Sequence, residues 1–410
     1  MIGGGHPAQQ YLDDTAEGRG DHLCRTAPSQ RRAMPPSLTR LEAPPAATRD
    51  FGEEWDLLNK IRQEILDLPR SLKETLEKGR PEYEAVVRQT RWGDGPVYLV
   101  GSGPSIPVAL SGAYAFESLL GWSAIHHTPQ AFEAYVLPAL RPRSVLLLIS
   151  PAGEEEEILS VAQVAASRGA TVLALTTKPE SPLARCADGL LLVRRFDQQE
   201  AGLMSLVCQQ AAAGYLALVA AQTLKRPQAL QELAAAEFGK LPGHVEWVLT
   251  QLADVVGSWA SELNERPALE VVGAGFYHPT TMLAAFLLRK LTGIRAQSWE
   301  ASEFIAGGAD RLARDSLVVC LSGSRCRLKK VVHQAAALAK TRGARIMSVT
   351  DANDRELSAS SAVSVLLPSL TEVVGAPLTL ALLEGVIYQA ARARAAGGGP
   401  VLPVDSRPRR

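Results

Sequence analysis

The fold of this 410-residue chain follows from one stretch, Val97-Tyr98-Leu99-Val100-Gly101-Ser102-Gly103-Pro104-Ser105. The apolar run predicts a buried strand, and the glycines and small residues after it predict a turn into a helix. The same order returns 172 residues later as Leu269-Glu270-Val271-Val272-Gly273-Ala274-Gly275. A strand, a glycine turn and a helix start can present backbone N–H groups to an anion. The two copies therefore predict a duplicated α/β unit.

Further pairs of residues keep the same spacing between the two copies. Glycines and serines recur 172 residues apart, pairing Gly101 with Gly273, Gly103 with Gly275, Gly121 with Gly293, and Ser150 with Ser322. A matched order of turns and strand ends at a fixed period is typical of an internal repeat. Strand and helix patterns alternate in both copies, which favours parallel sheets covered on both faces. We predict two tandem α/β domains, each a parallel sheet between two layers of helices.

Composition shifts along the chain predict how it is divided. Residues 1–50 have no apolar periodicity and are expected to be disordered, with Met34 as an alternative start to Met1. The other predicted segments are leading helices in 51–90, a first domain in 91–226, a helical linker in 227–266, a second domain in 267–394 and a flexible tail in 395–410. The sequence alone does not choose between the two starts.

Charge and cysteine content exclude several classes of protein. Lys and Arg number 43, as do Asp and Glu, so the formal net charge is zero, which argues against a general nucleic-acid or anionic-membrane surface. The five cysteines include no pair with zinc-site or CxxC spacing. No uninterrupted apolar run reaches the ~18 residues that span a bilayer. We expect a cytoplasmic protein with reduced thiols, no metal, and neither nucleic acid nor a membrane as partner.

The candidate binding residues follow the predicted strands. In an open parallel sheet, ligands bind outside the carboxyl ends of the strands. The candidates in the first domain are Gly101, Ser102, Gly103, Ser105, Ser150 and Gly153. Those in the second are Gly273, Gly275, Ser322, Gly323, Ser324 and Arg325, where an arginine beside serines favours charge-assisted bonds to a phosphate. The same glycines can serve only tight turns and the serines only as helix N-caps, so both roles stay open.

A dinucleotide cofactor is not expected at the first turn. Ile106 stands where the GxGxxG motif has its third glycine, and His126-His127, rather than an acidic residue, end the second predicted strand. A GxSxG nucleophile elbow is also absent from the sequence. We therefore predict no cofactor.

Several stretches resemble a known family. They are Gly103-Pro104-Ser105, Phe116-Glu117-Ser118-Leu119, Ser150-Pro151-Ala152-Gly153-Glu154, Ser181–Asp188, Gly273-Ala274-Gly275, Trp299–Phe304 and Thr371–Pro377. Together they resemble tandem sugar isomerase (SIS) domains, and the likeness covers about residues 53–392. The arrangement is similar to the isomerase half of glucosamine-6-phosphate synthase and to related deaminases and deglycases. The resemblance implies two SIS domains, a sugar phosphate ligand and a homodimer.

The sequence departs from the family pattern at its functional positions. In the family's phosphate loop, Ser-x-Ser-Gly-Glu-Thr, Ala152 replaces the second serine and Glu155 the threonine. Ser205 survives from the family's Ser-Thr-Lys segment. Lys290 stands where many members carry the glutamate that moves a proton between C1 and C2, and Ala306 replaces the ring-opening histidine. The resemblance therefore implies a site without its usual acid and base.

Two functions follow, and they differ in catalysis. The first is a phosphosugar-binding protein with a degenerate isomerase site, acting in amino-sugar phosphate metabolism or its sensing. The alternative is an active isomerase, deaminase or deglycase in which Glu303, Lys290 and Glu300 supply a rearranged acid/base set. Lys290 could also act as an amine nucleophile, or be an ordinary surface lysine. A purely structural dimerisation module is the third interpretation.

Overall fold

The computed structural model describes residues 52–93, 95–195, 205–226 and 230–397. These residues pack together as a single unit. The disorder expected for residues 1–50 and most of the predicted tail lie outside the described residues.

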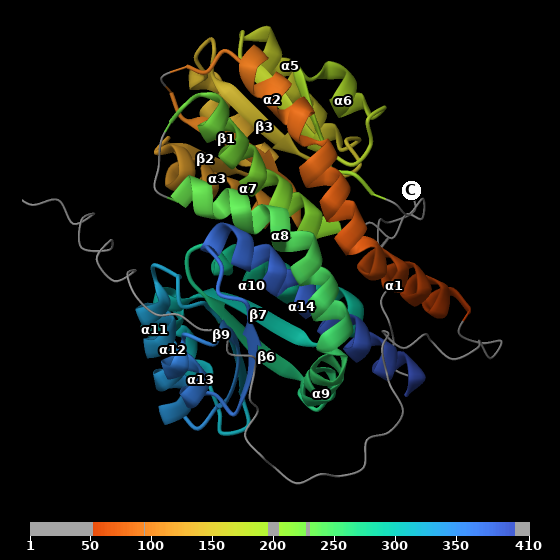
Figure 1. Ribbon diagram of the computed structural model, residues 1–410, viewed down its shortest axis with the longest axis vertical. Helices are drawn as coiled ribbons and strands as arrows, with labels where there is room; N and C mark the ends of the chain where they lie inside the picture. Colours follow the sequence, from red (N-terminus) through yellow and green to blue (C-terminus); the bar gives the residue numbers. More distant parts are fainter. Residues whose placement is uncertain (1–51, 94, 196–204, 227–229, 398–410) are drawn as a thin grey trace, which may run out of the picture. The chain divides into compact units, whose positions relative to one another are not determined.

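Ten strands form two sheets in which every pairing is parallel (Figure 1). The first sheet has the order β2-β1-β3-β4-β5 and the second β10-β9-β8-β6-β7, which is the same topology in each half. The first five strands are β1 (Val97–Gly101), β2 (Ala124–His127), β3 (Val145–Ile149), β4 (Thr171–Thr176) and β5 (Gly189–Leu192). The other five are β6 (Ala268–Gly273), β7 (Arg295–Glu300), β8 (Leu317–Leu321), β9 (Arg345–Asp351) and β10 (Val363–Leu367). The predicted duplication is confirmed at the level of topology.

Helices follow the strands in both halves. In the first half they are α1 (Gly52–Lys73), α2 (Arg80–Gln89), α3 (Ser105–Leu120), α4 (Pro129–Ala131), α5 (Glu156–Ser167), α6 (Pro182–Cys186) and α7 (Ser205–Thr223). The later ones are α8 (Leu230–Gln251), α9 (Ala253–Asn264), α10 (Tyr277–Thr292), α11 (Ala301–Ala306), α12 (Lys329–Thr341), α13 (Arg355–Ser360) and α14 (Glu372–Ala396). Short π or 3-10 turns lie at Glu74–Lys78, Phe132–Val136, Leu137–Ala139 and Gly308–Arg311.

Each sheet is covered on both faces, as the continuous apolar strands predict. In β3, Leu147 packs toward α3 and α7, whereas Leu146 and Leu148 pack toward α5 and α6. The second sheet repeats this arrangement, with α10 and α14 on one face and α11, α12 and α13 on the other. The predicted three-layer α/β/α architecture is therefore confirmed in both halves.

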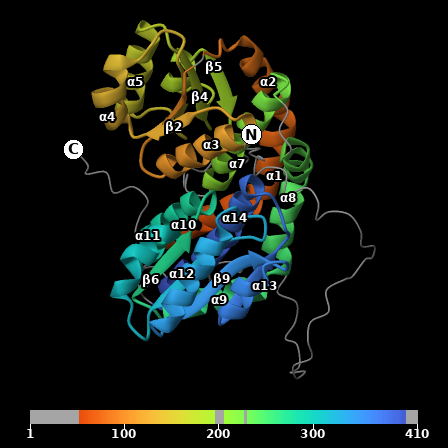
Figure 2. The ribbon, with the colours of Figure 1, turned by 90° about the vertical axis from the view of Figure 1, so that its left-hand side faces the viewer.

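The inner helices of the two halves share one core (Figures 1 and 2). Helix α7 packs against both α3 and α14, and α10 packs against both α14 and α3. A buried polar contact joins three of these helices: Gln210 Nε2 of α7 donates to Ser111 Oγ of α3 and Thr280 Oγ1 of α10, each at 3.1 Å. Helices α1 and α8 pack against α14 as well, so elements from both halves meet along it.

Helix α14 is the one described helix that is long and apolar enough, by length and composition alone, to cross a membrane. Its apolar residues form no uninterrupted run, because polar residues are scattered along the helix. The most apolar 18-residue stretch of α14 is 94% buried inside the protein. Core helices of this kind are commonly apolar on all sides.

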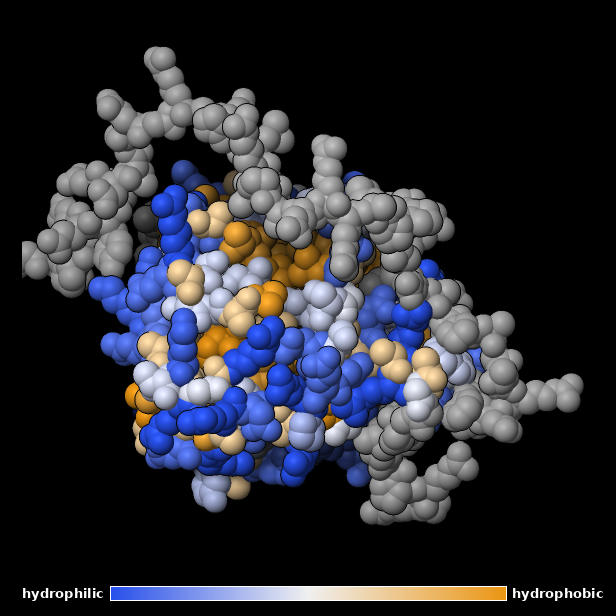
Figure 3. Space-filling model, turned by 90° about the horizontal axis from the view of Figure 1, so that it is seen from below, coloured by the Kyte–Doolittle hydropathy of each residue, from blue (hydrophilic) through white to orange (hydrophobic). Residues whose placement is uncertain are grey.

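The face of the molecule in Figure 3 is mainly hydrophilic, with hydrophobic residues gathered in a few places.

Candidate functional site

The first glycine turn lies where β1 ends, beside the end of β3. Gly101 pairs in register with the last residue of β3, so the turn and the loop that starts at Ser150 meet at one edge of the sheet. A Cβ at Gly101 would lie 2.6 Å from the backbone oxygen of Ser105, and Gly103 has a φ of +52°, so both positions favour glycine. The Ser105 N–H donates to the Ser102 carbonyl at 2.9 Å. The structure thus gathers these predicted residues in one turn.

The loop after β3 is closed by a carboxylate of its own chain. The Ser150 hydroxyl, on a residue only 1% exposed, donates to Glu155 and accepts the Gly153 N–H at 2.7 Å. Glu155 directly precedes α5, yet its side chain does not cap that helix. The hydroxyl predicted to meet a ligand is therefore already engaged. Ser205 begins α7, and its side chain lies outside the described part of the chain.

The second glycine turn repeats the first at the end of β6. Gly273 pairs in register with the last residues of β8 and β7, so the turn lies beside the loop that starts at Ser322. Gly275 has a φ of +56°. A Cβ there would lie 3.1 Å from a carboxylate oxygen of Glu372, the first residue of α14. The turn, the loop and the start of α14 therefore converge at one edge of the second sheet.

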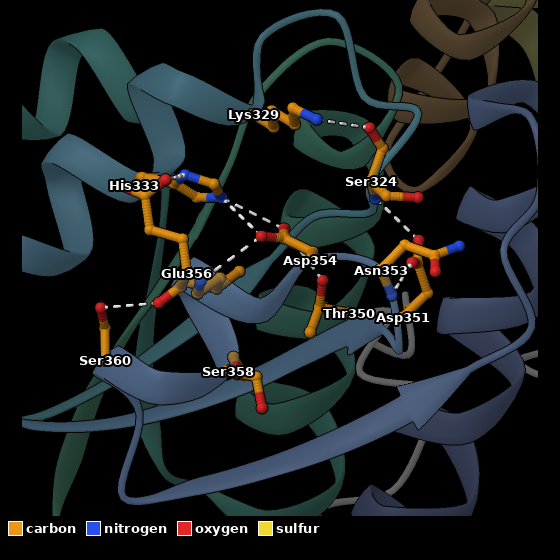
Figure 4. A network of polar contacts seen from close by, with 12 residues as sticks. Ser324, Lys329, His333, Thr350, Asp351, Asn353, Asp354, Glu356, Ser358 and Ser360 are labelled. Atoms are coloured by element: carbon orange, nitrogen blue, oxygen red, sulfur yellow. Dashed lines mark hydrogen bonds and ion pairs between the residues drawn. The ribbon is translucent and has the colours of Figure 1, made fainter. Parts of the chain in front are cut away.

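Polar contacts hold the second loop in place (Figure 4). The Ser324 N–H donates to Asp351 at 2.7 Å, and the Ser324 carbonyl accepts from Lys329 Nζ at 2.9 Å. A Cβ at Gly323 would lie 2.7 Å from the Tyr277 hydroxyl, so the loop packs tightly on the start of α10. The Ser324 amide is thus bound by an internal carboxylate.

Arg325 points toward α8. Its Nη1 lies 2.9 Å from a carboxylate oxygen of Glu237, a residue only 6% exposed. The other oxygen of Glu237 accepts the Thr371 N–H at 2.8 Å and the Thr371 hydroxyl at 2.5 Å. Arg325, predicted from the sequence as a phosphate ligand, thus forms an ion pair that ties the loop to α8 and the start of α14.

Ser322 differs from its counterpart Ser150. It is 2% exposed, and within the described chain its hydroxyl has no hydrogen-bond partner. Burial raises the pKa of the Cys326 thiol, four residues further along the same loop, and the Glu372 carboxylate raises it further. Five residues after Ser322 stands Arg327, in the position that Glu155 takes relative to Ser150. The second loop therefore contains a buried hydroxyl that makes no hydrogen bond within the described chain, and an exposed arginine.

A cavity of 380 Å³ opens beside this loop. Both halves of the chain and α8 line it, through Tyr114, Glu117, Ser118, Leu119, Leu230, Ala234, Gly275, Phe276, Arg327, Leu328, Thr371, Glu372 and Val373. We call this cavity the α3–α14 pocket. The starts of α10 and α14 adjoin it, and first turns leave N–H groups without partners inside their helices.

The polar groups of the α3–α14 pocket carry both signs of charge. Burial raises the pKa of Glu372, against hydrogen bonds from the Cys326 thiol and the Arg327 N–H and against the Arg327 charge. Burial also raises the pKa of Tyr114, which packs on Phe276 with ring centroids 5.7 Å apart. The pocket thus combines an aromatic wall, one guanidinium group and a buried carboxyl group.

The three candidate catalytic residues fall in two places. Glu300, at the end of β7, accepts the Ser302 N–H at 2.7 Å and so caps α11, on which Glu303 is exposed. Lys290 lies in the last turn of α10, about 20 Å along that helix from its start at 1.5 Å per residue. The structure brings the two glutamates together and places Lys290 apart from them.

Sequence reasoning missed His278, the second residue of α10. Burial lowers the pKa of its imidazole, whereas a hydrogen bond to the Trp299 backbone and the carboxylates of Glu300 and Glu303 raise it. The signal was its position directly after the second glycine turn, where the first copy has Ile106. His278 and the two glutamates form a group of titratable side chains at the end of β7 and the starts of α10 and α11.

Metal ligation has no candidate in the described ranges. No group of three or more His, Cys, Asp or Glu side chains there is placed to hold a metal ion.

Comparison with known sequences supports the repeat. The sequence model of the SIS domain matches residues 94–220 and again 262–392. A glutamine–fructose-6-phosphate aminotransferase of Gloeobacter violaceus is 23% identical over 339 residues, which cover 81% of this chain and 55% of that protein. Its namesake from Thermococcus kodakarensis is 25% identical over 360 residues, 87% of this chain and 58% of that protein. The chain thus spans little more than half the length of these curated relatives.

Solved structures show the same fold. The C-terminal domain of glucosamine-fructose-6-phosphate aminotransferase from Francisella tularensis superposes with a TM-score of 0.72 at 15% identity, covering 87% of this chain and 99% of that one. Glucosamine-6-phosphate deaminase from Thermotoga maritima superposes with a TM-score of 0.60 at 18% identity, covering 83% and 97%. At these identities the likeness concerns the fold alone.

Proposed function

This chain belongs to the SIS domain family, and on that premise we propose that it binds a sugar phosphate without isomerising it. The observation that carries the proposal is the α3–α14 pocket, which Arg327 lines together with the hydroxyl-bearing residues Tyr114 and Ser118. An arginine and a hydroxyl donor suit a phosphate monoester. The names of the relatives, which specify hexose 6-phosphates, support this ligand class.

We propose that the protein does not isomerise its ligand because of where the acid/base candidates lie and what they contact. Enediol proton transfer needs an acid or base held against the substrate. Glu300 is engaged as a helix cap, Glu303 is exposed, and Lys290 lies at the far end of α10 from the second glycine turn. Ala306 has no titratable group. This distribution favours binding over catalysis.

Binding should depend on Arg327. We expect Arg327→Ala to weaken binding of fructose 6-phosphate or glucosamine 6-phosphate at least 10-fold, because the variant removes the cation of the pocket. Isothermal titration calorimetry measures this change. Lys330→Ala is the matched control, since it also removes one positive charge but from an exposed position outside the pocket. Equal affinity of the Arg327→Ala and wild-type proteins would contradict the assignment.

Catalysis is tested separately by proton exchange. We expect no exchange of the C2 proton of bound glucose 6-phosphate in heavy water, followed by NMR over hours at saturating protein. Detectable exchange would favour the second candidate function, an isomerase with a rearranged acid/base set. The observation behind that alternative is His278, half-buried beside Glu300 and Glu303. In that case His278→Ala should abolish exchange while leaving sugar phosphate affinity within about threefold.

The wider setting is proposed on family grounds. We propose that the protein acts in the cytoplasm as a homodimer, in amino-sugar phosphate metabolism or its sensing. The balanced charge and the absence of zinc-site or CxxC spacing among the cysteines of the sequence support the compartment. Light scattering of the purified chain measures the assembly state directly.

A further inference from the structure

The buried serines that begin the two loops, Ser150 and Ser322, differ in the contacts of their hydroxyl groups. In the first domain, the Ser150 hydroxyl donates to Glu155, five residues on. In the second, the Ser322 hydroxyl has no partner in the described chain, and the residue five positions on is Arg327. The topology of the two sheets is the same, so each loop serves as an internal comparison for the other.

We infer that Glu155 sets ligand specificity in the first domain: its carboxylate occupies the place of a ligand anion on Ser150, so phosphate esters bind only in the second domain. The inference deepens the proposed function and rests on it for the second domain alone. A carboxylate that accepts from a buried hydroxyl makes the contact that a phosphate oxygen would otherwise make. The Ser150 hydroxyl then has an acceptor without any ligand. Each chain accordingly binds one phosphate ester, in the second domain.

The surroundings of Glu155 strengthen this exclusion. Glu156 follows it with further negative charge, whereas the charge of Glu154 is offset by an ion pair with Lys178 at 3.2 Å. A phosphate dianion beside Ser150 would therefore meet like charge as well as an occupied donor. At the adjoining turn, a Cβ added at Gly103 would have no atom within 4 Å, so this side of the turn is not covered by neighbouring atoms. Charge on one side chain thus closes a site whose backbone is otherwise retained.

The test is the stoichiometry of phosphate binding by the full chain. Titrations with inorganic phosphate and with glucosamine 6-phosphate are expected to give one site per wild-type chain and two per Glu155→Ala chain. Glu156→Ala, which removes an adjacent exposed carboxylate, is the control and should keep one site. A cooperative thermal transition close to that of wild type shows that the variant is folded. Should Glu155→Ala fail to fold, Glu155→Gln removes the charge at nearly constant volume and should still raise the number of sites.

The double variant Arg327→Ala, Glu155→Ala separates this inference from the proposed function. If both hold, the double variant keeps one site, now in the first domain, and Ser150→Ala added to it abolishes that site. If only the proposed function fails, wild type binds none and Glu155→Ala binds one. A folded Glu155→Ala or Glu155→Gln chain with the wild-type number of sites overturns the inference about Glu155.

Discussion

Replacing Glu237 with alanine is expected to lower the free energy of unfolding by about 3 kcal/mol. Glu237 lies in α8, is only 6% exposed, and accepts both the N–H and the hydroxyl of Thr371 at the start of α14. Alanine would leave these two donors without an acceptor, and each buried unsatisfied group costs roughly 1–3 kcal/mol. Urea unfolding followed by circular dichroism measures the change.

Arg325→Ala provides the matched comparison for this prediction. Arg325 forms the ion pair with Glu237 but is 43% exposed, so solvent can compensate for much of the lost pair. We expect a loss below about 1 kcal/mol, because Glu237 keeps its two contacts with Thr371. If Arg325→Ala destabilises the protein as much as Glu237→Ala, the ion pair and not the capping of α14 is the stabilising contact.

Glu384→Gln is expected to stabilise the protein increasingly as pH rises. Glu384 lies in α14 with 0% exposure, and neither carboxyl oxygen has a hydrogen-bond partner in the described chain. Burial and the neighbouring Glu64 raise the pKa of Glu384 well above its ordinary value. The folded state therefore binds this proton more tightly than the unfolded state, and deprotonation favours unfolding.

The sign of the pH effect follows from that raised pKa. The contribution of Glu384 to stability is fully present below its unfolded pKa, near 4.5, and is lost as pH rises toward the folded pKa. The amide introduced by Glu384→Gln does not titrate, so the variant should gain up to about 1.4 kcal/mol per pH unit over wild type in this range. Unfolding measured at pH 5 and pH 8 tests it. Glu246→Gln, the same change on an exposed face of α8, is the control and should show no such gain. If the stability of Glu384→Gln and of wild type changes with pH in parallel, the prediction is wrong.

Parts of the candidate site could be predicted because their signals are local. Gly101 and Gly103 follow an apolar strand directly, and their copies Gly273 and Gly275 repeat the signal. Parallel register then brings each turn beside the serine of the next strand end, as the structure shows for Ser150. His278 and Arg327 could have been found by the same comparison of the two copies, since His278 puts a titratable side chain where the first copy has Ile106, and Arg327 reverses the charge of Glu155.

The partners of the polar side chains could not be predicted in this way. Arg325 pairs with Glu237, 88 residues away, because α8 packs against α14, whose start adjoins the second loop. The α3–α14 pocket likewise joins Tyr114 to Glu372, which no spacing in the sequence connects. An arginine beside serines predicts an anion site only when no internal carboxylate reaches it first.

The sequence by itself determined the duplication, the parallel sheets and the place of the two turns, because hydrophobic period and glycine position act over a few residues and recur at a fixed interval. Only the tertiary structure decided which buried serine is engaged by a carboxylate. Glu155 accepts from Ser150, whereas the Ser322 hydroxyl makes no hydrogen bond within the described chain. The outcome depends on how side chains pack and pair across distant elements, and a charge reversed at one matched position separates two domains of the same topology.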